Sequence, residues 1–363
     1  MIVSPKKSDV LMLRPILPAF LSVQGFYLSE DEKKLFAKSN PLGVCLFARG
    51  CANVQNKEQL KKLCREIKEI IGRENVLIAV DQEGGRVRRL TEPEFTPLTE
   101  QAALRTPELV KMHADLAAYD LKTCGINVNF APVLDLFYPF TSNVLKGRCF
   151  SDDEKQTAEF GRIMADEYAA NGICPCIKHL PGHGRAETDP HLELPVVKET
   201  AAELEKDFYP FKKLDNAPMG MVAHLLLKAI DAENPASLSS TVIQQIIREK
   251  LGFNGFLVSD AIMMRALKGS ITERAKRTIK AGCDAVCLGN AGFEDNRQLA
   301  DSGLVLSDEG AERLNKISQI ISRPLQNLNY IQLKNKYCTE LKNIISYNSE
   351  YDATEVLSRI NNK

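Results

Sequence analysis

The sequence predicts an α/β protein, a single (β/α)8 TIM-type barrel with a helical C-terminal extension. Eight short apolar runs alternate with longer amphipathic stretches before residue 305. The runs are continuously apolar, which is typical of parallel strands buried on both faces. Polar residues end strand after strand, and in a barrel these ends share the face that carries catalytic residues. In a doubly wound open sheet, the alternative, they would spread along one edge.

Each strand is expected where β-branched and other apolar residues cluster. The eight expected strands are residues 19–24, 43–47, 76–81, 126–136, 175–180, 220–226, 255–259 and 284–289. Residues 1–305 would form the barrel. Beyond residue 305 the strand pattern stops, and apolar residues at helical spacing over 333–347 predict that residues 306–363 form a helical extension packed on the barrel.

Capping residues mark the helices between the strands. The expected start signals are Ser29 with Glu32, Thr106 with Pro107, Ser151 with Glu154, and Ser240 with Thr241. The expected end signals are Gly72, Gly125, Gly172 and Gly252. Between the start and end signals, residues 57–72 carry apolar side chains at the spacing of one helix face.

Composition narrows the possible partners and the compartment. The 363 residues are 44% hydrophobic and 26% charged, which excludes a disordered or fibrous chain. Lys+Arg and Asp+Glu both number 47, so neither nucleic acid nor an anionic membrane is expected as a partner. Arg14, Pro15 and Pro18 interrupt the apolar stretch 10–23, which argues against a membrane helix or a secretory signal. We therefore expect a cytoplasmic protein, and the ten scattered cysteines are expected to be free thiols.

The histidines are concentrated in one region. Four of the five lie between residues 179 and 224, and the densest segment, 178–191, runs from a strand end through a Gly/Pro loop to Asp189-Pro190-His191. An aspartate two residues from a histidine can orient the imidazole and raise its basicity. Zinc ligation by His183, Asp189 and His191, or a capped loop with hydrogen-bonded histidines, are the alternatives. The fifth, His113, falls in an expected helix and is interpreted as structural.

Three further charged residues lie where strands end or helices begin. Asp260 ends an apolar strand, so it is either salt-bridged or catalytic, because an unpaired buried charge is costly. Asp81 ends another strand, before Gly84-Gly85 and a run of arginines, and its carboxylate could accept hydrogen bonds from neighbouring sugar hydroxyls. Arg148 precedes an expected helix and could enter the same face or simply support the helix start.

Taken together, these motifs resemble glycoside hydrolase family 3, specifically its NagZ-like cytoplasmic β-N-acetylhexosaminidases of peptidoglycan recycling. The resemblance covers nearly the whole expected barrel. It rests on residues 81–87, 130–135, 147–151, 178–184, 189–191, 223–224, 259–260 and 281–284.

The resemblance implies a retaining exo-β-N-acetylglucosaminidase that removes N-acetylglucosamine from muropeptides by double displacement, without a metal or another cofactor. It implies that Asp260 is the nucleophile, His191 the general acid/base and Asp189 the partner of His191. The residues implied to hold the sugar are Asp81, Arg89, Arg148, Lys178 and His179.

Two departures from the family pattern fall in one loop. Gly184-Arg185-Ala186 stands where the family commonly has Gly-Asp-Thr, and Pro190 stands where it usually has serine. Proline restricts the backbone angle φ, so Pro190 should stiffen a loop that is thought to move.

Three other functions are compatible with parts of this pattern. A glycoside phosphorylase on the same scaffold fits, because a histidine tolerates an incoming phosphate better than a carboxylate would. A metal-dependent hydrolase would use the histidines as ligands. A sugar-binding protein without catalysis is disfavoured by the presence of Asp260, Asp189 and His191.

Overall fold

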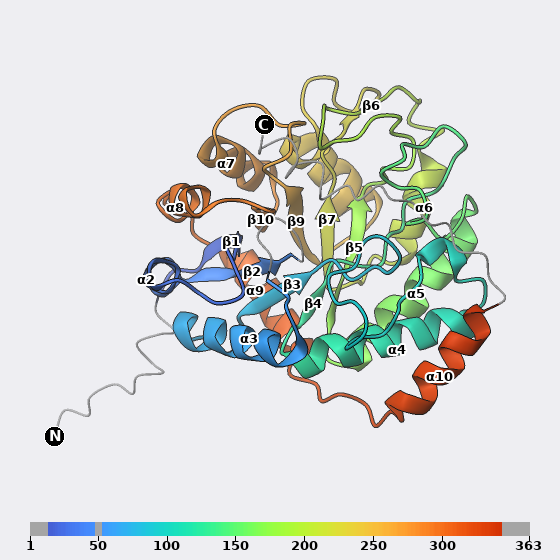
Figure 1. Cartoon of the computed structure of the whole chain (residues 1–363). Helices are drawn as coiled ribbons and strands as arrows, with labels where there is room; N and C mark the ends of the chain where they lie inside the picture. The colour runs from blue at the N-terminus through green and yellow to red at the C-terminus, as the bar shows by residue number, and fades with distance from the viewer. Residues whose placement is uncertain (1–13, 48–52, 343–363) are drawn as a thin grey trace.

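A computed structural model describes residues 14–47 and 53–342. Eight parallel strands form a closed barrel, in which each strand pairs with the next along the chain and the last pairs with the first (Figure 1). The strands are β1 (Leu17–Ser22), β2 (Pro41–Leu46), β3 (Leu77–Val80), β4 (Val128–Asn129), β5 (Cys174–Leu180), β7 (Met219–Val222), β9 (Phe256–Ala261) and β10 (Ala285–Cys287). The predicted (β/α)8 barrel is confirmed.

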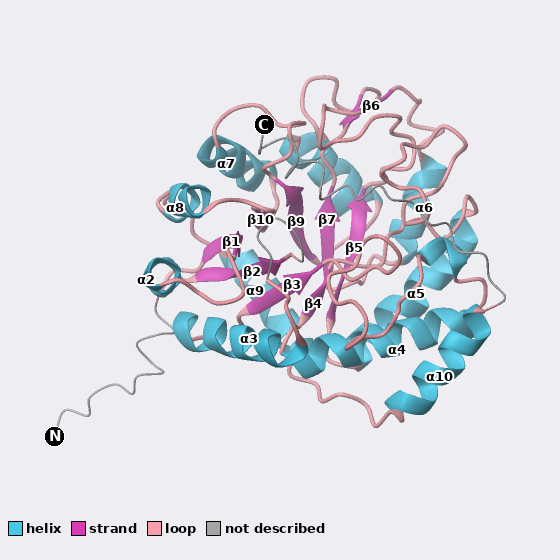
Figure 2. Ribbon diagram, in the orientation of Figure 1, coloured by secondary structure: helices cyan, strands magenta, loops and turns pink. Residues whose placement is uncertain are grey.

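Helices cover the outside of the barrel (Figure 2). They are α2 (Glu30–Ser39), α3 (Lys57–Ile71), α4 (Pro107–Cys124), α5 (Glu154–Ala170), α6 (Glu205–Lys213), the π-helical segment η3 (Val242–Lys250), α7 (Ile271–Ala281) and α8 (Phe293–Ala300). The predicted capping box of Ser29 and Glu32 is present, and Thr106 caps α4. Gly125 ends α4 at a φ of 89°, a conformation that glycine adopts without a Cβ penalty.

Two predicted boundaries were wrong for local reasons. Helix α5 is capped by Asp153 rather than Ser151, because the Asp153 carboxylate accepts hydrogen bonds from two main-chain N–H groups of the first turn. The predicted strand 126–136 is regular only over Val128–Asn129. Beyond it the chain still follows β5, but Pro132 has no N–H to donate and accepts from the Lys178 N–H instead.

The predicted strand 220–226 ends early and its remainder has a different role. Residues Leu226–Leu227 form β8, which pairs with β6 (Val196–Val197) in a small separate sheet. This sheet joins the loop that follows β5 to the loop that follows β7. The joined loops lie above the C-terminal ends of the barrel strands (Figure 1).

Two further helices follow the barrel. Helix α9 (Asp308–Ile321) buries Leu314 and Ile317 among residues of the barrel interior. Helix α10 (Tyr330–Leu341) lies along α4. The helix predicted over 333–347 thus starts earlier, and residues 343–347 lie outside the described part. The domain limit at residue 305 stays a prediction.

The structure also bears on the cysteines and on possible membrane-spanning helices. The described cysteines are free and mostly buried, and Cys51 lies outside the described residues. No helix within 14–47 and 53–342 is both long and apolar enough to cross a bilayer.

Candidate active site

A cavity that is partly open to solvent lies at the C-terminal ends of the barrel strands. Its wall includes seven of the eight predicted site residues, namely Asp81, Arg89, Arg148, Lys178, His179, His191 and Asp260. The eighth, Asp189, lies beside His191. The barrel therefore brings together residues that are up to 179 positions apart in the sequence.

One side of the cavity is a network of buried charges. The Lys178 Nζ donates to Asp81 Oδ1 at 2.8 Å, and Arg89 Nη2 lies 3.4 Å from Asp81 Oδ2. Burial opposes ionisation of Asp81, but the two cations outweigh it and lower the pKa of this carboxyl. Asp81 therefore presents an ionised carboxylate to the cavity.

Glu83 is the centre of this network, and sequence reasoning missed it. Arg148 donates two hydrogen bonds of 2.8 Å to its carboxylate, and Lys178 Nζ lies 2.6 Å from Glu83 Oε1. Burial opposes ionisation of Glu83, but Arg148 and Lys178 pull its pKa far below the usual range. Its spacing from Asp81 was the available signal, because residues i and i+2 of extended chain face the same side.

Arg148 accordingly enters the cavity and is not a surface residue. Its guanidinium is held by Glu83 and by the Val144 carbonyl. This bidentate pairing fixes the plane of the guanidinium, so its remaining N–H groups have a defined direction.

His179 is oriented by a carboxylate that the sequence placed only at a strand end. The Nδ1 of His179 lies 2.6 Å from Asp135 Oδ2, and Asp135 Oδ1 accepts the main-chain N–H of His183. A carboxylate can only accept, so Nδ1 carries the proton. The Nε2 of His179 is then left for a ligand.

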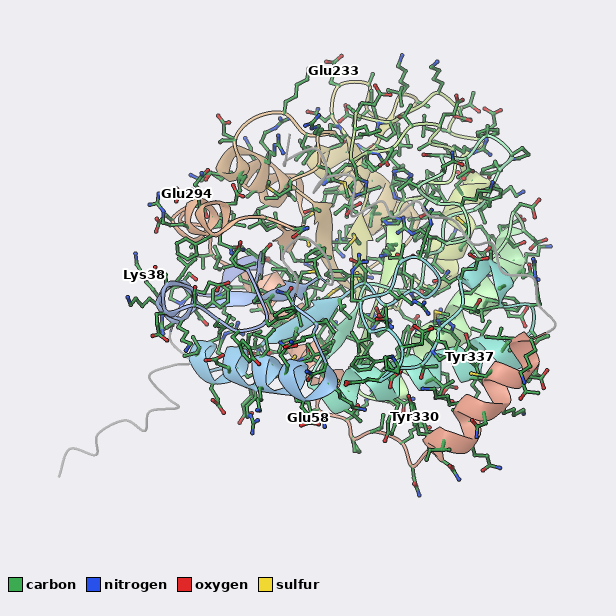
Figure 3. The ribbon with its side chains drawn as sticks, in the orientation of Figure 1. Lys38, Glu58, Glu233, Glu294, Tyr330 and Tyr337 are labelled. Atoms are coloured by element: carbon green, nitrogen blue, oxygen red, sulfur yellow. The ribbon has the colours of Figure 1, made fainter. Side chains whose placement is uncertain are left out.

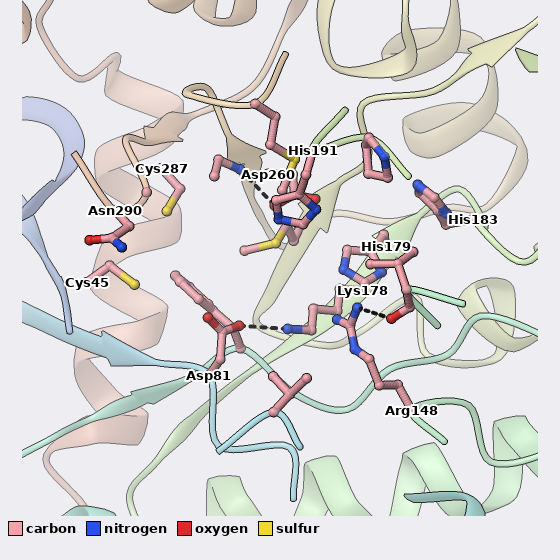
Figure 4. A pocket seen from close by; sticks show the side chains of 18 of the residues that line it. Cys45, Asp81, Arg148, Lys178, His179, His183, His191, Asp260, Cys287 and Asn290 are labelled. Atoms are coloured by element: carbon pink, nitrogen blue, oxygen red, sulfur yellow. Dashed lines mark hydrogen bonds and ion pairs between the residues drawn. The ribbon is translucent and has the colours of Figure 1, made fainter. Parts of the chain in front are cut away.

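The predicted pair of Asp189 and His191 is present. Asp189 Oδ1 accepts both the main-chain N–H of His191, at 2.9 Å, and its Nδ1–H, at 2.7 Å. Both side chains are buried, and the N–H of Ala266 donates to the Pro190 carbonyl at 3.2 Å. Figure 4 shows His191 beside Asp260, on the side of the cavity opposite Asp81.

Asp260 lies at the end of β9. Its Oδ1 accepts the N–H of Ala261 at 2.7 Å, and within the described chain it forms no ion pair with lysine or arginine. Burial opposes ionisation, but His179, His224 and the Ala261 N–H outweigh it, so the pKa of Asp260 falls below its ordinary value. The salt-bridged interpretation of Asp260 is therefore wrong, and an ionised oxygen faces the cavity.

The other two histidines of the 179–224 region differ in their partners. The Nε2–H of His224 donates to the Ala261 carbonyl at 3.1 Å, and its Nδ1 lies 2.7 Å from Ser237 Oγ. His183 is 2% exposed, and neither of its ring nitrogens has a protein partner among the described residues. His224 thus supports β9, whereas His183 lines the cavity with unused hydrogen-bonding capacity.

The zinc alternative requires three converging ligands. Across residues 14–47 and 53–342 there is no group of three His, Cys, Asp or Glu side chains placed to hold a metal ion. His183, Asp189 and His191 therefore do not form the zinc site considered from the sequence, since Asp189 is engaged with His191 instead.

Similarity to known proteins identifies the family of the chain. Residues 17–320 match the glycosyl hydrolase family 3 N-terminal domain. The chain belongs to glycoside hydrolase family 3. Membership of this family confirms the resemblance inferred from the motifs, and the chain is a glycoside hydrolase.

Relatives within family 3 include β-hexosaminidases. One from Bordetella avium is 37% identical over 298 residues, covering 78% of this chain and 83% of the relative. The structure of NagZ from Neisseria gonorrhoeae with N-trifluoroacetyl-D-glucosamine has a TM-score of 0.80 at 30% identity, covering 90% of this chain and 98% of that one. A family 3 β-N-acetylglucosaminidase from Paenibacillus sp. has a TM-score of 0.74 at 26% identity, covering 94% and 66% respectively.

Arg185, one departure from the usual family 3 pattern, has partners of its own. Its Nε donates to Asp207 Oδ2 at 2.5 Å, its Nη1 lies 3.4 Å from Glu199, and the guanidinium carbon is 4.7 Å from the centre of the Tyr138 ring. Arg185 thereby ties the start of the loop that carries His191 to helix α6. Arg185 is thus held by local ion pairs with Asp207 and Glu199.

The buried histidines of this family 3 enzyme predict its stability at acid pH. Burial lowers the pKa of both His113 and His183 to about 4, whereas both take up protons near pH 6.5 in the unfolded chain. The free energy of unfolding should therefore fall as pH drops from 6.5 to 4, by at most about 1.4 kcal/mol per pH unit for each histidine. Denaturant unfolding at pH 7 and pH 5 measures this difference in the free energy of unfolding.

The variant His183→Gln provides the control for this pH dependence, because glutamine does not titrate. It should show a shallower loss of stability between pH 6.5 and 4. An unchanged pH slope in His183→Gln would contradict the assignment of His183 as a neutral buried group.

Proposed function

We propose that the chain is a cytoplasmic, retaining exo-β-N-acetylglucosaminidase that acts on muropeptides during peptidoglycan recycling. The observation that carries the proposal is the pairing of an ionised, unbridged Asp260 with the buried Asp189–His191 pair at one cavity. A nucleophilic carboxylate and a separate acid/base are the two groups that retention of configuration needs. The β-hexosaminidase relatives and the resemblance to recycling enzymes support the substrate class.

In the first step, Asp260 attacks the anomeric carbon of N-acetylglucosamine. The bond from that carbon to the leaving oxygen breaks while a carbon–oxygen bond to Asp260 forms. His191 donates its proton to the leaving oxygen, so the leaving group departs as a neutral alcohol. Asp189 accepts from Nδ1–H throughout, which places the transferred proton on Nε2.

In the second step, the neutral His191 takes a proton from water, and the oxygen of that water displaces Asp260 from the anomeric carbon. The carboxylate of Asp260 and the protonated His191 are both regenerated. Histidine suits both roles because its ordinary pKa lies near neutral pH.

The ion network would hold the sugar. Asp81 accepts from hydroxyls, whereas Lys178 and Arg148 donate to hydroxyl or acetyl oxygens. His179 adds Nε2, and Arg89 keeps Asp81 in place. Charged groups fixed in advance lose little entropy when the sugar binds.

The variant Asp260→Ala tests the nucleophile. It should abolish turnover of 4-nitrophenyl N-acetyl-β-glucosaminide while the circular dichroism spectrum stays unchanged, because no ion pair among the described residues involves Asp260. In the wild type, a slow fluorinated substrate should label Asp260, as mass spectrometry of peptides would detect. Labelling of a different carboxylate would contradict the assignment.

The variant His191→Ala tests the acid/base. A substrate with a good leaving group needs little protonation, so its first step should be affected least. The second step lacks its base, so a burst of nitrophenol should precede a steady state slower by about 10²–10⁴-fold. Azide needs no base and should restore turnover, with a β-glycosyl azide as product.

Wild-type assays with and without phosphate separate the hydrolase from the phosphorylase alternative. A hydrolase releases free N-acetylglucosamine in both conditions, whereas a phosphorylase releases the sugar 1-phosphate only when phosphate is present.

The His191→Ala variant also has an outcome that would contradict the acid/base assignment. Near-normal activity of His191→Ala on an unactivated disaccharide would show that His191 is only a loop residue.

A further inference from the structure

Helix α10 lies beyond the residues that match family 3, yet it contacts the loop that supplies Asp81 and Glu83. The family match ends at residue 320, and α10 spans Tyr330–Leu341 along α4. Tyr330 and Tyr337, labelled in Figure 3, are seven residues apart and share one helix face. Both hydroxyls reach the segment between β3 and α4.

Tyr337 is fully buried and belongs to a chain of hydrogen bonds. Its hydroxyl lies 2.9 Å from His113 Nδ1 and accepts the main-chain N–H of Thr99 at 3.1 Å. The other ring nitrogen of His113, Nε2, lies 3.0 Å from the main-chain carbonyl of Glu83. Two hydrogen bonds therefore separate α10 from the residue at the centre of the charge network.

Only one arrangement of protons satisfies all the hydrogen bonds that link Tyr337, His113 and Glu83. Burial lowers the pKa of His113 to about 4, so the ring is neutral at neutral pH. The Glu83 carbonyl can only accept, which puts the ring proton on Nε2. Nδ1 must then accept from the Tyr337 hydroxyl, whose oxygen accepts from Thr99. The Tyr337 hydroxyl thus donates to His113 and accepts from Thr99, so each hydrogen bond has a defined direction.

The main chain next to Glu83 leaves no room for another arrangement. A Cβ at Gly84 would lie 2.8 Å from His113 Cε1 and 2.0 Å from the Thr99 carbonyl oxygen. The backbone thus packs directly on the His113 ring. Glu83 is held at its carbonyl by His113, while its carboxylate holds Lys178 and Arg148 on the cavity side.

We propose that Tyr337 is a positioning residue for the sugar site. Through His113 it fixes the main chain at Glu83 and thereby sets the positions of Lys178 and Arg148. The inference rests on the proposed function in one respect, that these two cations bind the sugar.

The test compares Tyr337→Phe with a matched control, Tyr330→Phe. The Tyr330 hydroxyl also makes two contacts, each of 3.0 Å, with Asp120 Oδ1 and Thr96 Oγ1, and its ring stacks on Tyr119. Tyr330→Phe therefore removes an equivalent hydroxyl from the same helix without touching the link to Glu83. Both variants are assayed in the full chain, at a temperature where circular dichroism shows them folded.

Tyr337→Phe should raise KM for 4-nitrophenyl N-acetyl-β-glucosaminide by roughly 5- to 50-fold with a smaller change in kcat, because lost positioning weakens ground-state binding. Tyr330→Phe should leave KM within about twofold of the wild type. Equal KM values for the two tyrosine variants would show that α10 only packs on the barrel, and would overturn the proposal.

His113→Asn keeps the test decisive even if Tyr337→Phe does not fold. Asparagine can accept from Tyr337 but is too short to reach the Glu83 carbonyl, so KM should rise to the same extent. Where both single variants fold, the double variant should be no worse than either, because the two links act in series. A wild-type KM in His113→Asn would overturn the proposal.

Lys178→Ala separates this inference from the proposed function. If Lys178→Ala loses sugar binding while Tyr337→Phe does not, only the positioning role fails. If Lys178→Ala binds and turns over the substrate normally, the assignment of the sugar site itself fails, and the positioning role fails with it.

Discussion

The ion pairs of Glu83 are the interaction on which the proposed sugar-binding side of the cavity depends. Lys178 arrives from β5 and Arg148 from the loop after β4, and both meet the same carboxylate at 1% exposure. Burying three charges is costly unless each is paired and hydrogen-bonded, and removing one partner of such a group leaves an uncompensated charge. Glu83 thus allows two cations to be presented to a ligand from a largely apolar cavity wall.

The opposite side of the cavity depends on a separate set of contacts. Asp260 is fixed by the end of β9, while His191 is held by Asp189 in a loop that β6 and β8 tie down. His179, which Asp135 orients, connects the two sides, because its interaction with Asp260 also favours the ionised form of that carboxyl.

The sequence predicted the barrel and most of the cavity because parallel strands bring their C-terminal ends to one face. A polar residue at the end of an apolar run, such as Asp81 or Asp260, is therefore visible without a structure. The pairing of Asp189 with His191 was equally visible, since both partners lie within three residues.

The features that the sequence did not predict depend on contacts between residues far apart in the chain or on competition between neighbouring groups. The i+2 spacing from Asp81 is too weak a signal to separate Glu83 from a surface glutamate, because its partners are 65 and 95 residues away. Tyr337 and His113 are 224 residues apart, so their hydrogen bond follows only from the packing of α10 on α4. The shortened strand at Val128–Asn129 and the cap at Asp153 reflect competition between neighbouring hydrogen-bonding groups that are equally plausible in the sequence.

The most direct test of the Glu83 network is the kcat/KM of Glu83→Gln. Glutamine preserves the size of the side chain but removes the charge that Lys178 and Arg148 share. Loss of the Glu83 charge leaves two buried cations uncompensated. Lys178 and Arg148 should therefore move from their positions, and kcat/KM for 4-nitrophenyl N-acetyl-β-glucosaminide should fall by roughly 100-fold in a protein that is still folded. A folded Glu83→Gln enzyme with the wild-type kcat/KM would contradict the central role of this carboxylate.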